Sequence, residues 1–252
     1  MAGSAPNPAI EINDFTMKFG DKTVIDTLSF TIDKGETFGL LGSNGSGKTT
    51  ILRALLGIYP PTAGSLHIGG KKFEPQDGSS IGYLPEERGL YKKEKVIDIM
   101  TYFGRLKGLE ASAAREWSLA YLSKVDLADK AKVRLDKLSG GQQQKVQLGV
   151  TIMNNPSLLI LDEPTKGFDP VNRRLLLDII DEQKQKGTTV VLITHDMSEA
   201  ERLCDRILLL KNGNKAAYGT VKEVLKKFNK ATLDEVFLEV YGTRAHEEVV
   251  HG

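Results

Sequence analysis

The chain has 252 residues, of which 40% are hydrophobic and 27% are charged, so it is long enough for one large globular domain or two small lobes. Its 34 basic and 33 acidic residues leave a net charge of +1, which gives no sign of the basic surface that nucleic-acid binding requires. The single cysteine, Cys204, excludes an internal disulfide, and we interpret it as a small buried apolar side chain.

Neither a membrane span nor a secretory signal is predicted. The apolar runs fall well short of the roughly 18 residues that a transmembrane helix needs. Residues 1–8 lack the basic start and the apolar core of a signal peptide, and we interpret them as a loose leader. We therefore expect a cytosolic protein, or one that is peripheral to the cytoplasmic face of a membrane.

The first predicted strands alternate apolar and polar residues. Residues 10–17 and 24–32 follow this pattern, which favours antiparallel strands with one face in water. The turn between them carries Phe19, which, taken alone, we interpret as a core residue rather than a platform for a ligand. A further hairpin is predicted over residues 64–73, with a glycine pair at its turn.

A glycine-rich loop, GSNGSGKTT at residues 42–50, follows the apolar strand predicted at residues 37–41 and opens a helical pattern. Glycines let the backbone curl so that successive N–H groups point into one concavity, and the helix start adds its positive dipole end. Lys48 is placed to reach the β- and γ-phosphates of a nucleotide, and the Thr49 hydroxyl to coordinate Mg2+. The alternative is a turn that binds nothing; the flanking strand and helix favour nucleotide binding.

The middle of the chain predicts an α-helical lobe, residues 91–155, inserted into an α/β core. A strand near residues 81–84 breaks into a loop, and helix-forming residues then predict helices over 96–107 and 111–125. The second of these helices carries two aromatic side chains at i, i+4 spacing, which we interpret as core contacts.

The α/β core then resumes with two unbroken aliphatic runs, residues 158–161 and 189–193. Such runs are typical of strands that are buried on both faces of a parallel sheet, and the helical pattern over residues 172–186 links them as a βαβ crossover. Two short strands around an Asn-Gly turn follow, and residues 221–241 are predicted to be helical.

Two adjacent carboxylates, Asp162 and Glu163, end the first of these aliphatic strands. Open α/β sheets bind ligands at the carboxyl ends of their strands, so Asp162 is placed to hold Mg2+, directly or through water. Glu163 is then placed to orient or deprotonate a water molecule that attacks the γ-phosphate. The alternative is a strand that simply ends in acidic turn residues.

A second candidate anion site is the sequence LSGGQ at residues 138–142. Ser139 suits a helix N-cap, the two glycines allow another backbone to approach, and a helix is predicted from about Gln142. The alternative is an ordinary glycine-containing N-cap.

In these motifs the sequence resembles the ATP-binding cassette (ABC) ATPases, and the resemblance covers nearly the whole chain. Residues 138–142 match the family signature, residues 42–49 its Walker A loop and residues 158–163 its Walker B strand. The resemblance assigns nucleotide contacts to Phe19, Gly42, Ser43, Asn44, Gly45, Ser46, Gly47, Lys48, Thr49 and Thr50. It assigns the signature, which acts in trans, to Ser139, Gly140, Gly141 and Gln142, and the D-loop to Asp169. The catalytic residues that it implies are Lys48, Glu163 and His195, and the metal ligands are Thr49, Glu86 and Asp162.

The fold that the resemblance implies is α/β: a P-loop NTPase core with a mostly parallel sheet, an N-terminal antiparallel β subdomain and an inserted α-helical subdomain. The nucleotide-binding domain is expected over residues 9–223, with the helical subdomain at 91–155. Residues 224–252 are expected to form a short helical extension.

The resemblance also implies a head-to-tail dimer in which two ATP molecules, with Mg2+, lie between the subunits. The signature of one chain would cap the γ-phosphate that the other chain holds, which satisfies two-fold symmetry. Phe19 would stack on adenine, and His195 would donate to the γ-phosphate and sense its loss.

Two positions depart from the family pattern. Glu86 stands where a glutamine usually contacts Mg2+ or water; a carboxylate can ligate Mg2+ but adds negative charge and cannot donate a hydrogen bond. Lys166 replaces a small residue before the D-loop glycine, Gly167. Neither change affects Lys48 or Glu163, so competent hydrolysis is expected.

The resulting functional prediction is hydrolysis of Mg-ATP coupled to transport by separate permease subunits, with a second cassette as dimer partner. The closest pattern is that of multidrug, sodium and antibiotic-type exporters. Two other classes stay open: a soluble mechanochemical ATPase, and a nucleotide-dependent regulator that does not hydrolyse ATP. No nucleic-acid partner is expected.

Overall fold

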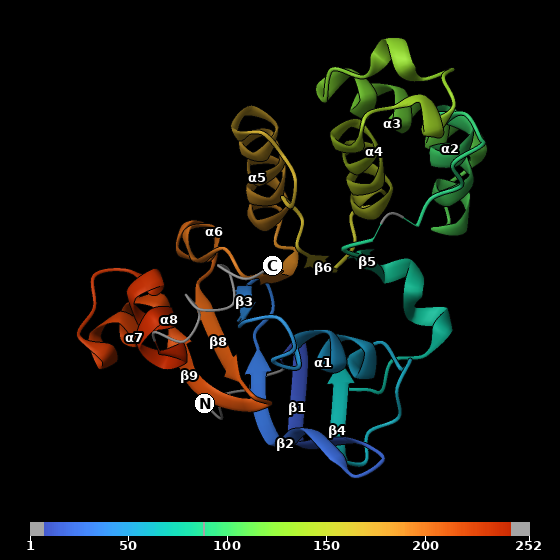
Figure 1. Ribbon diagram of the computed structural model, residues 1–252. Helices are drawn as coiled ribbons and strands as arrows, with labels where there is room; N and C mark the ends of the chain where they lie inside the picture. Colours follow the sequence, from blue (N-terminus) through green and yellow to red (C-terminus); the bar gives the residue numbers. More distant parts are fainter. Residues whose placement is uncertain (1–7, 88, 243–252) are drawn as a thin grey trace, which may run out of the picture. The chain divides into compact units, whose positions relative to one another are not determined.

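The computed structural model describes residues 8–87 and 89–242 (Figure 1). They belong to two compact units: residues up to 74 and from 191 onward form the first, and residues 75–190 form the second. The chain passes from the second unit into the first within β7 (Thr189–Thr194).

The first unit begins with an antiparallel sheet in the order β2-β1-β4. β1 (Ile10–Phe19) pairs with β2 (Lys22–Ile32) on one side and with β4 (Ala63–Ile68) on the other. Buried side chains alternate with more exposed ones along most of β1 and β2, so the sheet has one apolar face. This is the arrangement that the alternating sequence predicts.

The hairpin predicted over residues 64–73 is not formed. β4 takes β1 as its partner, and after the glycine pair only a single bridge joins Ile68 to Lys71. The local turn signal was correct, but the strand is paired by a distant segment that turn residues do not specify.

The same unit contains β3 (Thr37–Leu41), which is buried along its whole length and pairs in parallel with β8 (Arg206–Lys211). An Asn-Gly turn then leads into β9 (Asn214–Thr220), which pairs with β8 in antiparallel fashion. The ring of Phe30 stacks on that of Phe38 with 5.5 Å between centroids, which joins β2 of the antiparallel sheet to β3.

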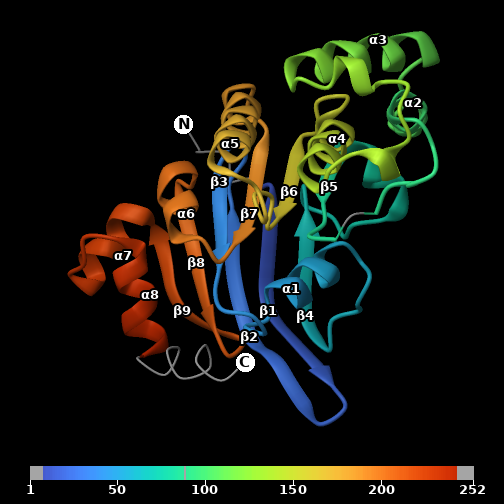
Figure 2. The ribbon, with the colours of Figure 1, turned by 45° about the horizontal axis from the view of Figure 1, so that its top comes forward.

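Four helices of the first unit flank these strands: α1 (Lys48–Leu55), α6 (Met197–Leu203), α7 (Val221–Phe228) and α8 (Leu233–Tyr241) (Figures 1 and 2). The C-terminal segment that was predicted to be helical is therefore two helices. Asn229, with φ +53°, ends α7 in a left-handed C-cap, and a new helix starts a few residues later.

In the second unit, β5 (Ile81–Leu84) and β6 (Leu158–Asp162) pair in parallel. Between them in the chain come α2 (Val96–Leu106), α3 (Ala111–Lys124) and α4 (Gly140–Ile152), which pack on one another (Figure 2).

α3 and α4 approach closely at Gly149, where an added Cβ would lie 2.3 Å from the ring of Tyr121. Tyr121 is buried, and its hydroxyl donates to the carbonyl of Lys145 at 2.8 Å. Burial in this apolar environment raises the pKa of Tyr121 well above its ordinary value. Tyr121 is thus the core contact that was predicted, whereas Trp117, stacked on it with 5.2 Å between ring centroids, is only partly buried.

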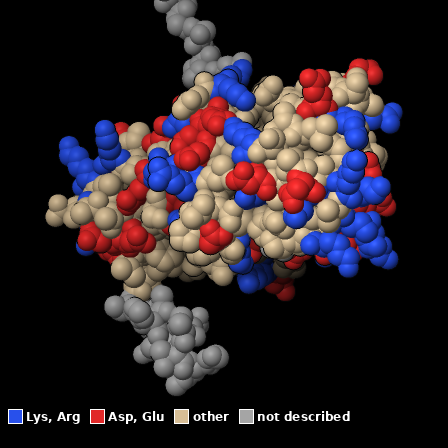
Figure 3. All heavy atoms as spheres, turned by 90° about the horizontal axis from the view of Figure 1, so that it is seen from above, with Lys and Arg blue, Asp and Glu red and all other residues tan. Residues whose placement is uncertain are grey.

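In the described part of the chain, no helix is long and apolar enough to cross a membrane. Figure 3 shows acidic and basic side chains interspersed over one face of the molecule, as the near-zero net charge leads one to expect.

Candidate functional site

The phosphate-binding loop predicted from the sequence connects β3 to α1. Gly42, Gly45 and Gly47 have φ of +150°, +76° and +111°, values that curl the backbone and that other residues rarely adopt. The N-terminus of α1 has no side-chain cap and no acidic residue in its first turn. Its backbone N–H groups and positive dipole end are therefore suited to an anion.

Lys48 is already directed at this loop. It is only 8% exposed, and its Nζ donates to the carbonyl oxygens of Gly42 at 2.7 Å and of Ser43 at 2.9 Å. The positive charge is thus held at the loop by two backbone acceptors. Both hydrogen bonds can be exchanged for bonds to phosphate oxygens.

Ser46 gives a second indication of an anion. Its backbone N–H and carbonyl are engaged by Ser43 and Gly213, but its Oγ is buried and has no hydrogen-bond partner. A buried hydroxyl without a partner is costly unless a ligand supplies one. Phosphate oxygens would satisfy it.

Phe19, the last residue of β1, is 46% exposed, so its interpretation as a core residue is wrong. Its ring meets the edge of Tyr59 with 5.3 Å between centroids, and the hydroxyl of Tyr59 accepts from Arg53 at 2.9 Å. Phe19 is therefore an exposed aromatic ring that packs against Tyr59, and an exposed ring of this kind is suited to stacking on a base.

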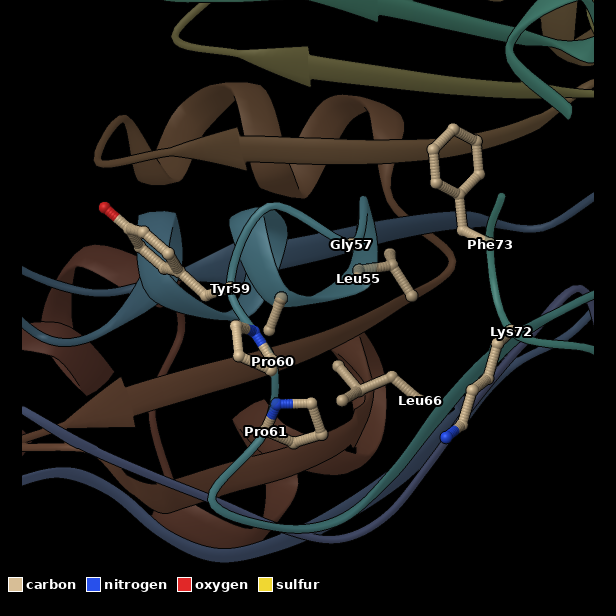
Figure 4. A pocket seen from close by; sticks show the side chains of 9 residues that line it. Leu55, Gly57, Tyr59, Pro60, Pro61, Leu66, Lys72 and Phe73 are labelled. Carbon is tan, nitrogen blue, oxygen red and sulfur yellow. The ribbon is translucent and has the colours of Figure 1, made fainter. Parts of the chain in front are cut away.

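A cavity of about 150 Å³ lies next to Tyr59, where α1 and β4 face each other (Figure 4). Its lining is mainly apolar, with prolines and the side chains of Leu55, Leu66 and Phe73. None of the predicted site residues lines it, so it is separate from the phosphate loop.

His195 follows directly after β7, and it is exposed. The residues on either side of it are fixed: the Asp196 N–H donates to the Thr194 hydroxyl at 3.0 Å, and the Asp196 side chain caps α6 by accepting from Glu199. The backbone that carries the imidazole is thus rigid while its side chain is accessible, as a group that contacts a ligand must be.

In the second unit, Asp162 and Glu163 lie at the carboxyl end of β6, and both are buried. Glu163 has φ +49°, a left-handed conformation that is unfavourable for a glutamate. Strained residues of this kind concentrate at functional sites.

Ser139 is the N-cap of α4, as predicted, although the helix begins at Gly140 rather than near Gln142. The Ser139 Oγ accepts from the Gln142 N–H at 3.3 Å, and the Ser139 N–H donates to the Gln142 side chain at 2.9 Å. This capping box leaves the N–H groups of Gly140 and Gly141 without an acceptor inside the helix. They, with the Ser139 hydroxyl, are the donors that an anion would meet.

α4 also positions two loops through a polar stripe that the sequence analysis missed. Gln144, Gln147 and Thr151 are all buried. The side chains of Gln144 and Gln147 donate to the carbonyls of Pro164, at 3.1 Å, and of Glu87, at 3.5 Å, whereas the Thr151 hydroxyl donates to the Gln147 carbonyl of its own helix at 2.8 Å. Their i, i+3, i+7 spacing places them on one helix face, and this period was visible in the sequence.

The D-loop residue Asp169 caps α5 (Pro170–Gln185), accepting from the N–H groups of Val171 and Asn172, each at 3.0 Å. These hydrogen bonds, led by those from Asn172, hold the pKa of Asp169 below its ordinary value. Next to it, the ring of Phe168 lies 3.2 Å from where a Cβ on Gly141 would be. A side chain at position 141 would therefore require the Phe168 ring to shift by a few tenths of an ångström.

The two residues that depart from the family pattern contact each other. The Lys166 Nζ lies 2.6 Å from Oε1 of Glu86, and the two side chains are 59% and 45% exposed. The hydrogen bond and charge of Glu86, with a smaller effect of the Glu163 charge, raise the pKa of Lys166. The carboxylate that replaces a glutamine is thus neutralised by the lysine that replaces a small residue.

The structure places the predicted residues in two groups. The first unit holds Phe19, residues 42–50 and His195; the second holds Glu86, residues 139–142, Asp162, Glu163 and Asp169.

The residues present fit a magnesium nucleotide. The loop has curled glycines, an uncapped helix start and the unpartnered Ser46 hydroxyl. Among the residues described, no cluster of three His, Cys, Asp or Glu could hold a metal alone. Mg2+ is usually held by one or two protein ligands together with phosphate oxygens. Thr49 and Asp162 are ligands of the appropriate chemistry.

Comparison with known proteins gives consistent relatives. The ABC transporter family profile matches residues 25–166. An uncharacterized ABC transporter ATP-binding protein of Methanocaldococcus jannaschii is 45% identical over 220 residues, which cover 87% of this chain and 80% of the relative. The Nod factor export ATP-binding protein I of a Rhizobium species is 38% identical over 232 residues, covering 91% of this chain and 76% of the relative. A solved ATP-binding subunit of an ABC transporter superposes with a TM-score of 0.86 at 29% identity, covering 93% of this chain and all of that one.

Proposed function

Because the chain belongs to the ABC transporter family and is an ATPase of that family, we propose that it powers an exporter by ATP-driven dimerisation, in complex with separate permease subunits. It has the family fold, with a P-loop core, an N-terminal antiparallel β subdomain and inserted helices. The observation that carries the nucleotide assignment is the phosphate loop, with its buried lysine and its unpartnered buried hydroxyl.

In this proposal each group has a defined role. The loop N–H groups and Lys48 would bind the phosphates, and Thr49 and Asp162 would hold Mg2+. When bound, Mg2+ neutralises charge on the phosphate oxygens. Glu163 accepts a proton from the attacking water, and His195 donates a hydrogen bond to the γ-phosphate. Glu86 is proposed as a further contact to Mg2+ or its water.

The N-terminus of α4 is the basis for proposing a dimer. Two N–H groups and a hydroxyl converge at Ser139, Gly140 and Gly141, in a helix start that has no acidic residue in its first turn. A γ-phosphate held by a second subunit would supply the anion. A two-fold axis then creates two equivalent sites from one pair of surfaces.

The exporter assignment is supported by a relative that is named for Nod factor export. As part of the same proposal, the protein acts at the cytoplasmic face of a membrane. The test is to purify the tagged chain from detergent-solubilised membranes of its own cells, with Lys48→Ala as the control. We expect an integral membrane protein to copurify with both variants and ATPase activity with the wild type alone. Copurification with ribosomes instead would support the soluble mechanochemical alternative.

The Glu86–Lys166 pair yields a prediction of its own. An ion pair this exposed contributes little to stability, because water screens the two charges. Lys166→Ala should therefore hardly change the melting temperature, but it leaves the Glu86 charge unneutralised and should lower kcat/KM for Mg-ATP about threefold to tenfold. Combining it with Glu86→Gln, which removes that charge, should restore most of the loss. Steady-state kinetics of the two single variants and the double variant measure this; strictly additive effects would show that the pair has no functional role.

A further inference from the structure

The C-terminal helix α8 is tied to the first unit at both ends. At its start the N–H of Leu233 donates to the side chain of Glu201 on α6, and at its end the carbonyl of Val240 accepts from the ammonium of Lys211 on β8. The side chains of Leu233 and Val236 are buried. The helix is therefore a fixed part of this unit up to Tyr241.

Tyr241 brings this helix to the phosphate loop. Its hydroxyl oxygen accepts a hydrogen bond from the N–H of Ser43 at 2.9 Å, although the two residues are 198 positions apart. The same hydroxyl donates to the carbonyl of Leu210 on β8. The ring itself is held by stacking on Phe237, with 4.3 Å between centroids.

The Ser43 N–H belongs to the same peptide group as the Gly42 carbonyl, which accepts from Lys48 at 2.7 Å. One peptide group is thus held on its N–H side by Tyr241 and on its C=O side by Lys48. The hydrogen bonds run in series from Lys48 through this peptide and Tyr241 to Leu210, and bonds in series polarise and strengthen one another.

We propose that Tyr241 is a positioning residue for nucleotide binding, which links the docking of α8 to occupancy of the phosphate loop. The inference rests on the proposed function, in which Lys48 exchanges its hydrogen bond to the Gly42 carbonyl for one to the phosphates of ATP. Tyr241 then remains as the group that fixes the peptide orientation. Because linkage is reciprocal, ATP stabilises the docked helix, and displacing the helix weakens ATP binding.

The test compares Tyr241→Phe with a matched control, Tyr218→Phe. Both variants lose one partly buried hydroxyl of the first unit, but that of Tyr218 donates to the Thr31 carbonyl at 3.2 Å and accepts from Arg206, with no contact to the loop. We expect Tyr241→Phe to raise the Kd for Mg-ATP about fivefold to tenfold, the size of one lost hydrogen bond, and Tyr218→Phe to leave it unchanged. A merely structural role would lower the melting temperature of both variants and leave both Kd values unchanged.

A second measurement follows the helix itself. Hydrogen exchange of the wild-type amides at residues 236–241 should slow when Mg-ATP is added, and Tyr241→Phe should abolish this added protection. If wild type binds Mg-ATP while both the Kd of Tyr241→Phe and the protection of α8 stay unchanged, the inference is wrong and the proposed function stands. If wild type does not bind Mg-ATP, the proposed function itself fails.

Discussion

Glu163→Gln is expected to lower steady-state hydrolysis of Mg-ATP by about 10²–10⁴-fold, the usual contribution of a general base. The buried Glu163 follows β6 in a left-handed backbone conformation, so its side chain has a fixed starting point. An amide of the same size keeps that geometry but cannot accept the proton of the attacking water. Hydrolysis measured by phosphate release checks this result.

The same variant should accumulate an ATP-bound dimer, whereas the wild-type dimer dissociates after it hydrolyses ATP. Size-exclusion chromatography with Mg-ATP should show Glu163→Gln as a dimer and wild type mostly as a monomer. Glu182→Gln is the matched control, because Glu182 on α5 pairs with Lys124 away from β6. If Glu163→Gln keeps its turnover, another group is the base. If neither protein hydrolyses or dimerises, an obligate partner chain must supply the opposing signature.

The elements that the sequence predicted well are those specified by local pattern. The buried strands β6 and β7 follow from unbroken aliphatic runs, and the N-cap at Ser139 follows from cap chemistry. The glycine loop also follows, since its φ values need glycine whatever the surroundings. In each case the structure is determined by residues that are close together in the sequence.

Most of the features that were missed depend on residues far apart in the chain. Glu86 and Lys166 were both noticed, but each was judged alone because 80 positions separate them. The surroundings of Phe19 include Tyr59, which is distant in the sequence. The hydrogen-bond partner of Tyr241 is the backbone N–H of Ser43, and because every residue but proline has such a group, the sequence does not identify it. The break at Asn229 was locally visible, since asparagine tolerates the left-handed conformation.

The second large effect is expected from Gly42→Ala. Gly42 is buried with φ +150°, and an added Cβ would lie 2.5 Å from the Ser46 Oγ and 2.7 Å from the Leu210 carbonyl oxygen. The serine can rotate, but the carbonyl belongs to the backbone of β8, so the loop itself must shift. Strain and overpacking together should cost about 2–5 kcal/mol of folding free energy. A shift of this kind should lower kcat/KM for Mg-ATP about a hundredfold or more.

The matched control is Gly69→Ala, which also has positive φ, +58°, but whose added Cβ would meet nothing within 4 Å. Backbone strain should lower the folding free energy of this variant by about 1 kcal/mol or slightly more, and the variant should keep wild-type affinity for ATP. Denaturant unfolding measures the folding free energy, steady-state hydrolysis measures kcat/KM, and nucleotide titration measures the affinity for ATP. Adding Tyr241→Phe should not rescue Gly42→Ala, because the fixed obstacle is the Leu210 carbonyl rather than the phenol. Wild-type ATP affinity in Gly42→Ala would mean that the start of the loop moves freely, and it would remove the basis for placing Tyr241 as its support.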